Sequence, residues 1–410
     1  MLTLSDSKGT GGKVKSSPDD FIVKEITSKG HILNPDQDYT AQELGEQEDL
    51  SGKFTTFILQ KKGWETVNSL IRISKLTGHG KKSISYAGTK DKQSISTQLA
   101  AIYGVDPERM MGVRLKDVWI NGAWKSNGVE LGSNIGNSFT VVIKGCKATK
   151  PMEETMSQLD AKAPNYFDRQ RFGMRLNNFS VGMSILKGDF KEAVMDILTN
   201  TNLETNEEAK EARKRFAKDQ DYNAALQYFP KHLRSERTII EYMSKYDNPA
   251  NALRKLPRGI LMMFVHSVQS LMFNAALEAR IKEKDFKSPI SCKKNFYGFP
   301  DIDTVDGDGD FPLGSIVGYE TKPEHITDYD RKVLKKFDIK QEDFKIKQMP
   351  ELSMRGSFRN LLMPVKDLSF SAQGKDITVD FSIPSGSYAT ILLNEITKSD
   401  GLELSDITKA

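Results

Sequence analysis

The apolar positions in the first hundred residues form short runs that are separated by polar, turn-rich segments. These runs are rich in aromatic and β-branched residues, which is typical of strands. The pattern predicts four strands, at Phe21–Val23, Phe54–Gln60, Ser83–Ala87 and Ile95–Tyr103.

The period of the apolar positions changes between the second and the third of these runs. From Val67 to Leu76 the apolar residues recur at three- and four-residue spacing, which predicts a helix. Thr66 is the expected N-cap and Gly78 the expected stop signal. The charged segment Gly88–Lys92 is then expected to be a turn between two buried strands.

The rest of the chain has a helical middle between β-rich segments. Val118–Ile143 has the composition of strands and turns, and the stretch from Leu176 to about Arg280 has mostly helical spacing. Lys284–Gly318 is rich in loop-forming residues, and Phe358–Leu393 returns to strand character. We therefore expect an α+β protein in which a helical block is inserted into a discontinuous domain.

Composition excludes several classes of protein. The chain has 410 residues, 38% of them apolar, and it contains no run of eighteen apolar residues and no apolar segment near its start. Its two cysteines are far apart and its five histidines are scattered, so a disulfide framework or a zinc site is not expected. We expect a cytoplasmic protein with no membrane span and no bound metal.

A small net charge conceals one strongly basic region. The whole chain has a net charge of +4, whereas residues 54–92 alone contain eight basic and two acidic residues. The segment Ala163–Arg175 interleaves three arginines with three aromatic residues. Basic residues neutralise phosphates and aromatic rings stack on unpaired bases, so both segments are candidates for binding RNA. The alternative interpretation is a solvated face with aromatic residues in the core.

Asp91 is the one acid in the charged turn, and it lies between Lys90 and Lys92. Neighbouring cations lower the pKa of a carboxyl group and keep it ionised. A positioned carboxylate can then act as a nucleophile or a general base. Spacing alone does not distinguish this role from that of an ordinary solvated turn residue.

Several motifs together closely resemble those of the TruD family of tRNA pseudouridine synthases. The first is Tyr86–Lys92 followed by Thr97-Gln98, and five further stretches agree in the family's order over nearly the whole chain. These stretches are Asp20–Glu25, Leu131-Gly132 with Gly136–Phe139, Asn165–Gly173, Phe264–Asn274 and Gly386–Thr390. Thr89 resembles archaeal and eukaryotic members, since bacterial ones usually have leucine there. Asp168 departs from the glycine that is common at its position.

The resemblance implies a particular architecture. The expected fold is a pseudouridine synthase core with a central mixed β-sheet, interrupted by an α-rich TruD insertion domain. The catalytic domain is expected at residues 1–174 and 361–410, and the insertion domain at residues 175–360.

The resemblance also implies an activity and a set of site residues. Family members isomerise a uridine in tRNA, typically at position 13 in the D-arm, to pseudouridine without a cofactor or a metal. The family's catalytic aspartate corresponds to Asp91, which we infer is activated by Lys90 and Lys92. Asn165 and Phe167 correspond to the family's active-site pair, with Phe167 expected to pack on the flipped base. The further candidates for substrate binding are Lys24, Lys90 and Arg171.

Two other functions remain open at this point. The first is an RNA-binding protein or tRNA chaperone that has kept the fold and lost catalysis. The second is pseudouridine synthesis on an RNA other than tRNA. No obligate protein partner is evident from the sequence, and the intact motif around Asp91 favours an active enzyme.

Overall fold

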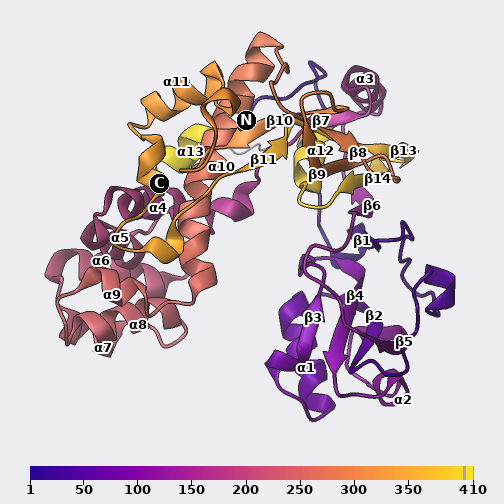
Figure 1. Ribbon diagram of the computed structural model, residues 1–410, viewed down its shortest axis with the longest axis horizontal. Coiled ribbons are helices and arrows are strands. Elements are labelled where there is room, and N and C mark those ends of the chain that lie inside the picture. Colours follow the sequence, from indigo (N-terminus) through magenta and orange to yellow (C-terminus); the bar gives the residue numbers. More distant parts are fainter. Residues whose placement is uncertain (400–402, 410) are drawn as a thin grey trace.

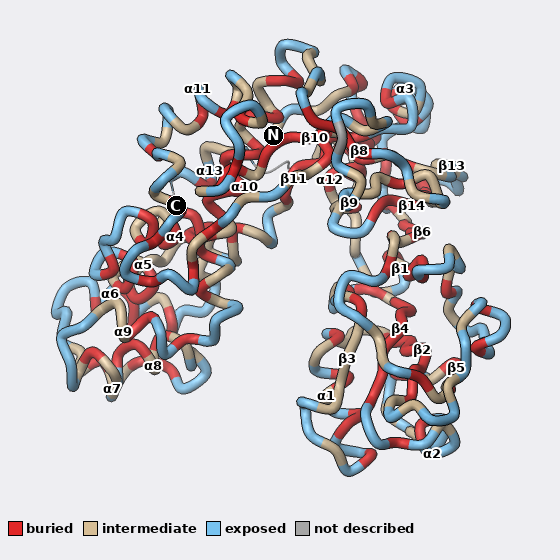
Figure 2. The backbone as a smooth tube through the Cα atoms, viewed as in Figure 1, coloured by how far each residue is buried: buried red, intermediate tan, exposed pale blue. Residues whose placement is uncertain are grey.

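The fold is described by a computed structural model, and the residues described are 1–399 and 403–409. Figure 1 shows two limbs that meet at one end, so that the molecule has the outline of an arch. One limb consists of helices and the other consists mainly of strands. Figure 2 shows that the buried segments run along the strands of one limb, along a long helix of the other, and through the junction.

The main sheet has eight strands and extends from the junction through the β-rich limb. Its order is β13 (Lys366–Gln373), β14 (Asp376–Pro384), β6 (Gly136–Ile143), β1 (Phe21–Ile26), β4 (Ile95–Tyr103), β2 (Phe54–Lys62) and β5 (Val118–Ser126), with β3 (Ile84–Tyr86) also paired to β4. β1 and β4 are parallel, whereas the other neighbouring strands are antiparallel. The expected α+β fold with a central mixed sheet is therefore confirmed.

Two helices cover the outer part of this sheet. α1 (Thr66–Leu76) and α2 (Pro107–Met111) pack their apolar side chains on β2, β4 and β5. The helix that the sequence predicts is α1, but its N-cap is Glu65 and not Thr66. Thr66 is the first helical residue, and its side chain is completely buried and bonded to the loop after β3.

The helical limb is built around one long helix. α10 (Arg258–Glu283) packs against α4 (Asn178–Lys187), and the remaining helices of the limb surround them. These are α5 (Phe190–Thr199), α6 (Glu207–Asp219), α7 (Tyr222–Tyr228), α8 (Arg234–Met243), α9 (Pro249–Leu253), α11 (Asp328–Lys336) and α13 (Leu404–Thr408). Within the described residues, α10 alone is long and apolar enough to cross a membrane. Its most apolar stretch is 72% buried against the rest of the protein, as in the core helix of a soluble protein.

Short strands connect the two limbs, and here two expectations are wrong. The region expected to be loop-rich contains β8 (Ser291–Lys294), β9 (Pro300–Asp306) and β10 (Phe311–Ile316), which form a sheet with β11 (Ser357–Asn360). β12 (Leu362–Pro364) pairs with β7 (Lys162–Pro164). The expected strand character does not reach Leu393, because Ala389–Thr397 forms helix α12. Its run of three consecutive large apolar residues, Ile391–Leu393, fits a buried helix as well as a strand.

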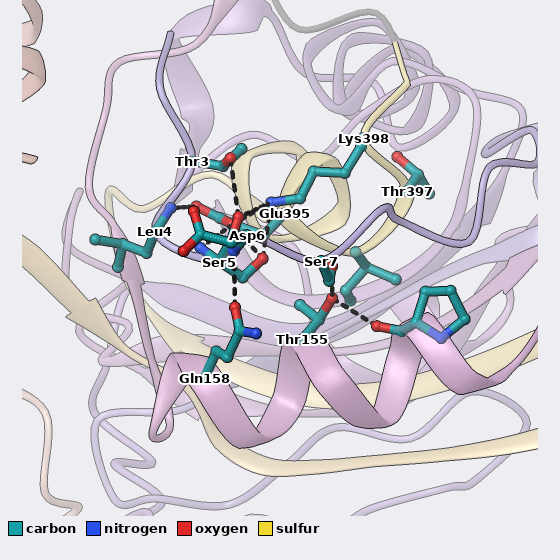
Figure 3. A network of polar contacts seen from close by, with 12 residues as sticks. Thr3, Leu4, Ser5, Asp6, Ser7, Thr155, Gln158, Glu395, Thr397 and Lys398 are labelled. Atoms are coloured by element: carbon teal, nitrogen blue, oxygen red, sulfur yellow. Dashed lines mark hydrogen bonds and ion pairs between the residues drawn. The ribbon is translucent and has the colours of Figure 1, made fainter. Parts of the chain in front are cut away.

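The start of the chain is attached to both α12 and α3 (Lys150–Leu159), as Figure 3 shows. The backbone N–H of Leu4 donates to the Glu395 carboxylate at 2.6 Å, and Lys398 donates to the backbone oxygen of Ser5 at 2.9 Å. On the other side, the Ser7 and Thr155 hydroxyls are 2.6 Å apart. These contacts fix the path of the segment that leads to Lys15.

The limits of the inserted domain stay a prediction. The helices from α4 to α11 do lie between two groups of strands that share the main sheet. The proposed division at residues 174/175 and 360/361 is consistent with that order, but the order does not fix it to the residue.

Candidate active site

A cavity of about 350 Å³ lies where the loop after β3 meets β1, β6 and the segment before α12. Its volume is in the range of roughly 300–1,000 Å³ that is typical of small-molecule sites. Asp91 lies on its wall, in the loop Gly88–Lys92, which we call the Asp91 loop. The rings of Phe21, Phe139 and Tyr388 also line the cavity.

The backbone of the Asp91 loop is held by buried polar side chains. Gln98 of β4 donates its side-chain amide to the Gly88 carbonyl at 2.8 Å. The Lys90 N–H donates to the Thr66 hydroxyl at 2.9 Å, and Thr66 in turn donates to Gln98 at 3.0 Å. Because Thr66, Lys90 and Gln98 are buried and paired, the loop is fixed before any ligand binds.

The Asp91 carboxylate is contacted by two residues from distant parts of the chain. Lys15 donates its ammonium to Oδ2 in an ion pair, and the Gln170 amide donates to Oδ1 at 3.1 Å. The side chain is 33% exposed, so it remains accessible from the cavity. Burial raises the pKa of this carboxyl group. The ion pair with Lys15, the hydrogen bond from Gln170 and the charge of Lys61 together outweigh burial, so the pKa lies below its ordinary value.

Lys61 supports the Asp91 loop from beneath. It belongs to β2, has no exposed surface, and donates its ammonium to the Asp91 carbonyl at 2.9 Å and to the Lys90 carbonyl at 3.4 Å. Burial lowers the pKa of Lys61 to about 8, although the charge of Asp91 opposes this shift. Around neutral pH, Lys61 therefore places a positive charge under the site.

Lys90 is buried and points away from the Asp91 carboxylate. Its ammonium pairs with Glu25 at 2.7 Å, and the two side chains are only 5% and 1% exposed. The other oxygen of Glu25 accepts the Leu99 N–H at 2.9 Å, so this ion pair joins β1, β4 and the Asp91 loop. The expected activation of Asp91 by Lys90 and Lys92 is therefore corrected, since Lys15 and Lys61 are the cations that lower its pKa.

Lys24 lies on the opposite face of β1 from the residues that line the cavity. Phe21 and Val23 face the cavity, and successive side chains of a strand alternate between its two faces. Lys24 donates to the Thr140 hydroxyl of β6 at 3.2 Å, and it is not among the cavity-lining residues. The structure does not bring Lys24 together with Asp91.

Asn165 lies behind the cavity wall, where its side chain is fully engaged. Its amide N–H group donates to Oδ1 of Asn360 at 2.8 Å. Its oxygen accepts from Arg359 at 2.7 Å and from Ser387 at 3.1 Å. Ser387 itself lines the cavity, so Asn165 contacts the wall and not the space.

The backbone of Phe167 is held by Asn274 of α10. The Phe167 N–H and carbonyl make two hydrogen bonds with the Asn274 amide, both of 2.8 Å. The ring is 5% exposed and lies edge-on to Phe273 with the centroids 5.7 Å apart. Phe167 is not among the cavity-lining residues, so its packing on a flipped base stays a prediction.

Two guanidinium groups lie over the Phe167 ring. Arg171 is 5.1 Å and Arg359 is 4.2 Å from its centroid. Arg359 also donates to the carbonyl of Gly386, which lines the cavity, at 3.0 Å. Arg171 is not among the cavity-lining residues.

The chain matches the family of tRNA pseudouridine synthase D (TruD) over residues 2–294 and 301–396. The chain belongs to this family. It is therefore a tRNA pseudouridine synthase, which is an isomerase.

Archaeal relatives are similar to the chain over nearly its full length. A probable tRNA pseudouridine synthase D of Methanococcoides burtonii is 31% identical over 98% of this chain and 97% of its own. The probable enzyme of Archaeoglobus fulgidus is 30% identical over 97% of each chain. The crystal structure of the putative TruD of Methanosarcina mazei superposes with a TM-score of 0.76 at 27% identity, covering 99% of this chain and 97% of that one.

Four residues make key contacts at the TruD site. The sequence did not place them there, or placed them there only loosely. Lys15 lies in a polar segment with no motif character, and Arg359 lies outside the motifs. Gln170 lies in a motif, but nothing in the sequence connects it with Asp91. Lys61 did carry a usable signal, because a lysine inside a strand buried on both faces needs a polar partner.

The described part of the chain contains no group of three or more His, Cys, Asp or Glu side chains that could hold a metal ion. Nothing in the geometry around Asp91 therefore suggests ligands for a metal. The charged groups that approach the carboxylate are lysines.

Proposed function

We propose that this enzyme converts the uridine at position 13 of tRNA to pseudouridine, with Asp91 as the nucleophile. One observation carries the proposal: an accessible carboxylate with a lowered pKa faces a cavity of nucleotide size. Family membership supports the reaction and the tRNA substrate. The choice of position 13 rests on the resemblance of the motifs to those of the family.

The reaction rearranges bonds within one nucleotide. The bond between N1 of uracil and C1′ of ribose breaks, the base rotates, and a bond forms between C5 and C1′. The C5 proton leaves and N1 gains a proton, so nothing is oxidised and no group is transferred. We therefore propose that the enzyme needs no redox or group-carrying cofactor.

The ionised Asp91 carboxylate fits each of three routes through this rearrangement. It can attack C1′ and form a glycosyl ester, it can attack the base, or it can assist formation of a glycal. The first two routes require a free oxygen lone pair, which the low pKa maintains at neutral pH. In all three, Lys15 stabilises the carboxylate whenever it regains its negative charge.

The target uridine must leave the base stack to reach Asp91. Extrusion costs a few kcal/mol, and a pocket that receives the base offsets this cost. We propose that Phe21, Phe139 and Tyr388, whose rings line the cavity, supply that receiving surface. The basic residues around the Asp91 loop would attract the tRNA backbone.

The test is to incubate the enzyme with an unmodified tRNA transcript and to map pseudouridines by carbodiimide treatment and primer extension. We expect one new stop that reports position 13, and no such stop in a transcript that carries cytidine there. Modification at another position would overturn the choice of target. Absence of any modification would overturn the proposed reaction.

A further inference from the structure

The arginines above Phe167 have positive charges that no carboxylate in the described residues balances. Arg171 and Arg359 come from different elements, the 3₁₀ helix Arg169–Phe172 and strand β11. Neither guanidinium forms an ion pair with an acid among residues 1–399 and 403–409. Two arginines that are close together and have no counter-ion repel each other, so the fold tolerates this arrangement at an energetic cost.

Arg171 has unused hydrogen-bonding capacity. Its Nε is buried without a partner, and its guanidinium makes no hydrogen bond to the described residues. Its guanidinium lies over the ring of Phe167. A buried donor without a partner is rare, and an unfilled ligand position is one of its physical explanations.

Arg359 is held rigidly in place. It donates to the Asn165 carbonyl at 2.8 Å, to the Asn165 side-chain oxygen at 2.7 Å and to the Gly386 carbonyl at 3.0 Å. These acceptors are neutral, so its charge is oriented but not cancelled. Burial lowers the pKa of Arg359 to about 10, the nearby Tyr388 opposes this, and the charge of Arg171 lowers it further.

His266 of α10 adds a third nitrogen group to this surface. Burial lowers its pKa, and the positive charge of Arg171 lowers it further. Each of the three residues keeps part of its surface exposed. The surface thus combines two fixed positive charges with an imidazole that can donate or accept a hydrogen bond.

We propose that Arg171 and Arg359 bind a phosphodiester of the RNA backbone directly next to the target uridine. This inference rests on the proposed function. The planar guanidinium matches the geometry of phosphate oxygens, and a phosphate supplies the missing negative charge. The position identifies the nucleotide, because Arg359 bonds to Gly386 of the cavity wall and lies 5.9 Å from the ring of Tyr388, which also lines the cavity.

The two arginines have different tasks in this arrangement. Arg359, whose guanidinium is fixed by hydrogen bonds to carbonyl groups, positions the phosphate and also holds Asn165. Arg171, which has free donors, makes the phosphate contacts that neutralise the charge. Anchoring one flanking phosphate would fix the point at which the RNA strand turns into the cavity.

The test combines a protein substitution with removal of one RNA charge. Short D-arm RNAs are made with an uncharged methylphosphonate at the linkage 5′ of the target uridine, 3′ of it, or six linkages away. Wild-type enzyme and Arg171→Gln are compared by filter binding and by single-turnover rates at increasing enzyme concentration. Filter binding scores the phosphate contact whether or not pseudouridine forms.

We expect Arg171→Gln to weaken binding of the all-phosphate RNA by about tenfold or more, since it removes a charge-assisted hydrogen bond to the phosphate. For wild type, a methylphosphonate at one flanking linkage should weaken binding similarly, and the remote linkage should have little effect. For Arg171→Gln the flanking methylphosphonate should cost nothing further. Arg171→Lys, which keeps the charge, should restore most of the sensitivity.

The exposed Arg331 of α11 provides the matched control, because it pairs with Asp328 and is not among the cavity-lining residues. Arg331→Gln should leave the effect of every methylphosphonate unchanged. Equal losses for wild type and Arg171→Gln at both flanking linkages would overturn the phosphate site. If wild type makes no pseudouridine in the all-phosphate RNA, the proposed function fails instead, and the binding data still decide on the phosphate.

Discussion

The protein has two clusters of basic side chains near its cavity, and they differ in how their charges are balanced. In the Asp91 loop, Lys90 pairs with Glu25, Lys15 pairs with Asp91, and Lys61 bonds to two carbonyls. Over Phe167, Arg171 and Arg359 pair with no acid in the described residues, and Arg171 makes no side-chain hydrogen bond. The positive charges of the first cluster are paired or hydrogen-bonded within the protein, whereas those of the second cluster have no anionic partner in the described residues.

This difference separates two requirements of the reaction. The reacting group must be oriented and ionised before the substrate arrives, so its supports come from the fold. A backbone phosphate arrives with the substrate, so its partners must be left unpaired in the free enzyme. The contrast predicts that substitutions in the first cluster change stability and chemistry, and that Arg171 affects mainly RNA binding.

The largest effect on stability is expected at the buried ion pair. Glu25→Gln leaves the Lys90 ammonium buried without a negative partner, which should cost about 3–5 kcal/mol in the free energy of unfolding. Urea denaturation of the variant and the wild type measures it.

The control for this prediction is Glu241→Gln. Glu241 of α8 pairs with Lys245 just beyond the end of that helix, and both side chains are more than half exposed. It should cost no more than about 0.5 kcal/mol. A similar small cost at Glu25 would mean that the Asp91 loop does not depend on this pair.

Lys61→Met should slow catalysis by about one to two orders of magnitude with little change in RNA affinity. The substitution removes a positive charge beneath Asp91 and one of the two side-chain donors to each of the Lys90 and Asp91 carbonyls. Single-turnover kinetics separate the two effects. A loss confined to RNA affinity would show that Lys61 acts on the substrate.

The pH dependence of the wild type provides a second measurement of Lys61. Because the pKa of Lys61 falls to about 8 in the folded protein, its charge and its help to Asp91 should be lost above about pH 8. The unfolded chain binds more protons between pH 8 and the ordinary lysine pKa, so the contribution of Lys61 to stability should rise over that range. Lys61→Arg should move the alkaline decline in rate to higher pH.

The smallest of these effects is expected at Lys15. Lys15→Gln removes one of the interactions that lower the pKa of Asp91, so the acid limb of the rate profile should move to higher pH. Asp91 contributes stability above its unfolded pKa, and this is lost as the pH falls through its folded pKa. Near neutral pH Asp91 stays ionised, so the rate should fall only several-fold.

Lys13 offers a control in the same segment, since its side chain is exposed. Lys13→Gln should leave the acid limb in place, and Lys15→Arg should largely restore it. An unchanged acid limb in Lys15→Gln would show that Lys15 does not control the ionisation of Asp91.

Much of the fold was predictable because its strands and helices have clear periods. β2, β4 and β6 are apolar runs, and α1 has a regular apolar face. α12 was missed because the run of apolar residues from Ile391 fits both a strand and a buried helix. The sheet around β9 was missed because its residues are polar and its partners are far away in the chain.

The site was predictable where it depends on local motifs and not where it depends on tertiary contacts. The motif that contains Asp91 does line the cavity. Sequence neighbours proved to be poor guides to electrostatics, because the side chain of Lys90 points toward Glu25 while Lys15 comes from 76 residues away. That approach depends on the anchored N-terminal segment, which has no motif of its own (Figure 3).

The most direct test of the central claim is to compare Asp91→Asn with wild type on one tRNA transcript in single-turnover reactions, with binding measured in parallel. Asparagine keeps the shape of the side chain and removes the negative charge. The account predicts that pseudouridine formation falls by a factor on the order of a thousand or more while tRNA affinity changes little. Pseudouridine formation by Asp91→Asn at the wild-type rate would contradict it.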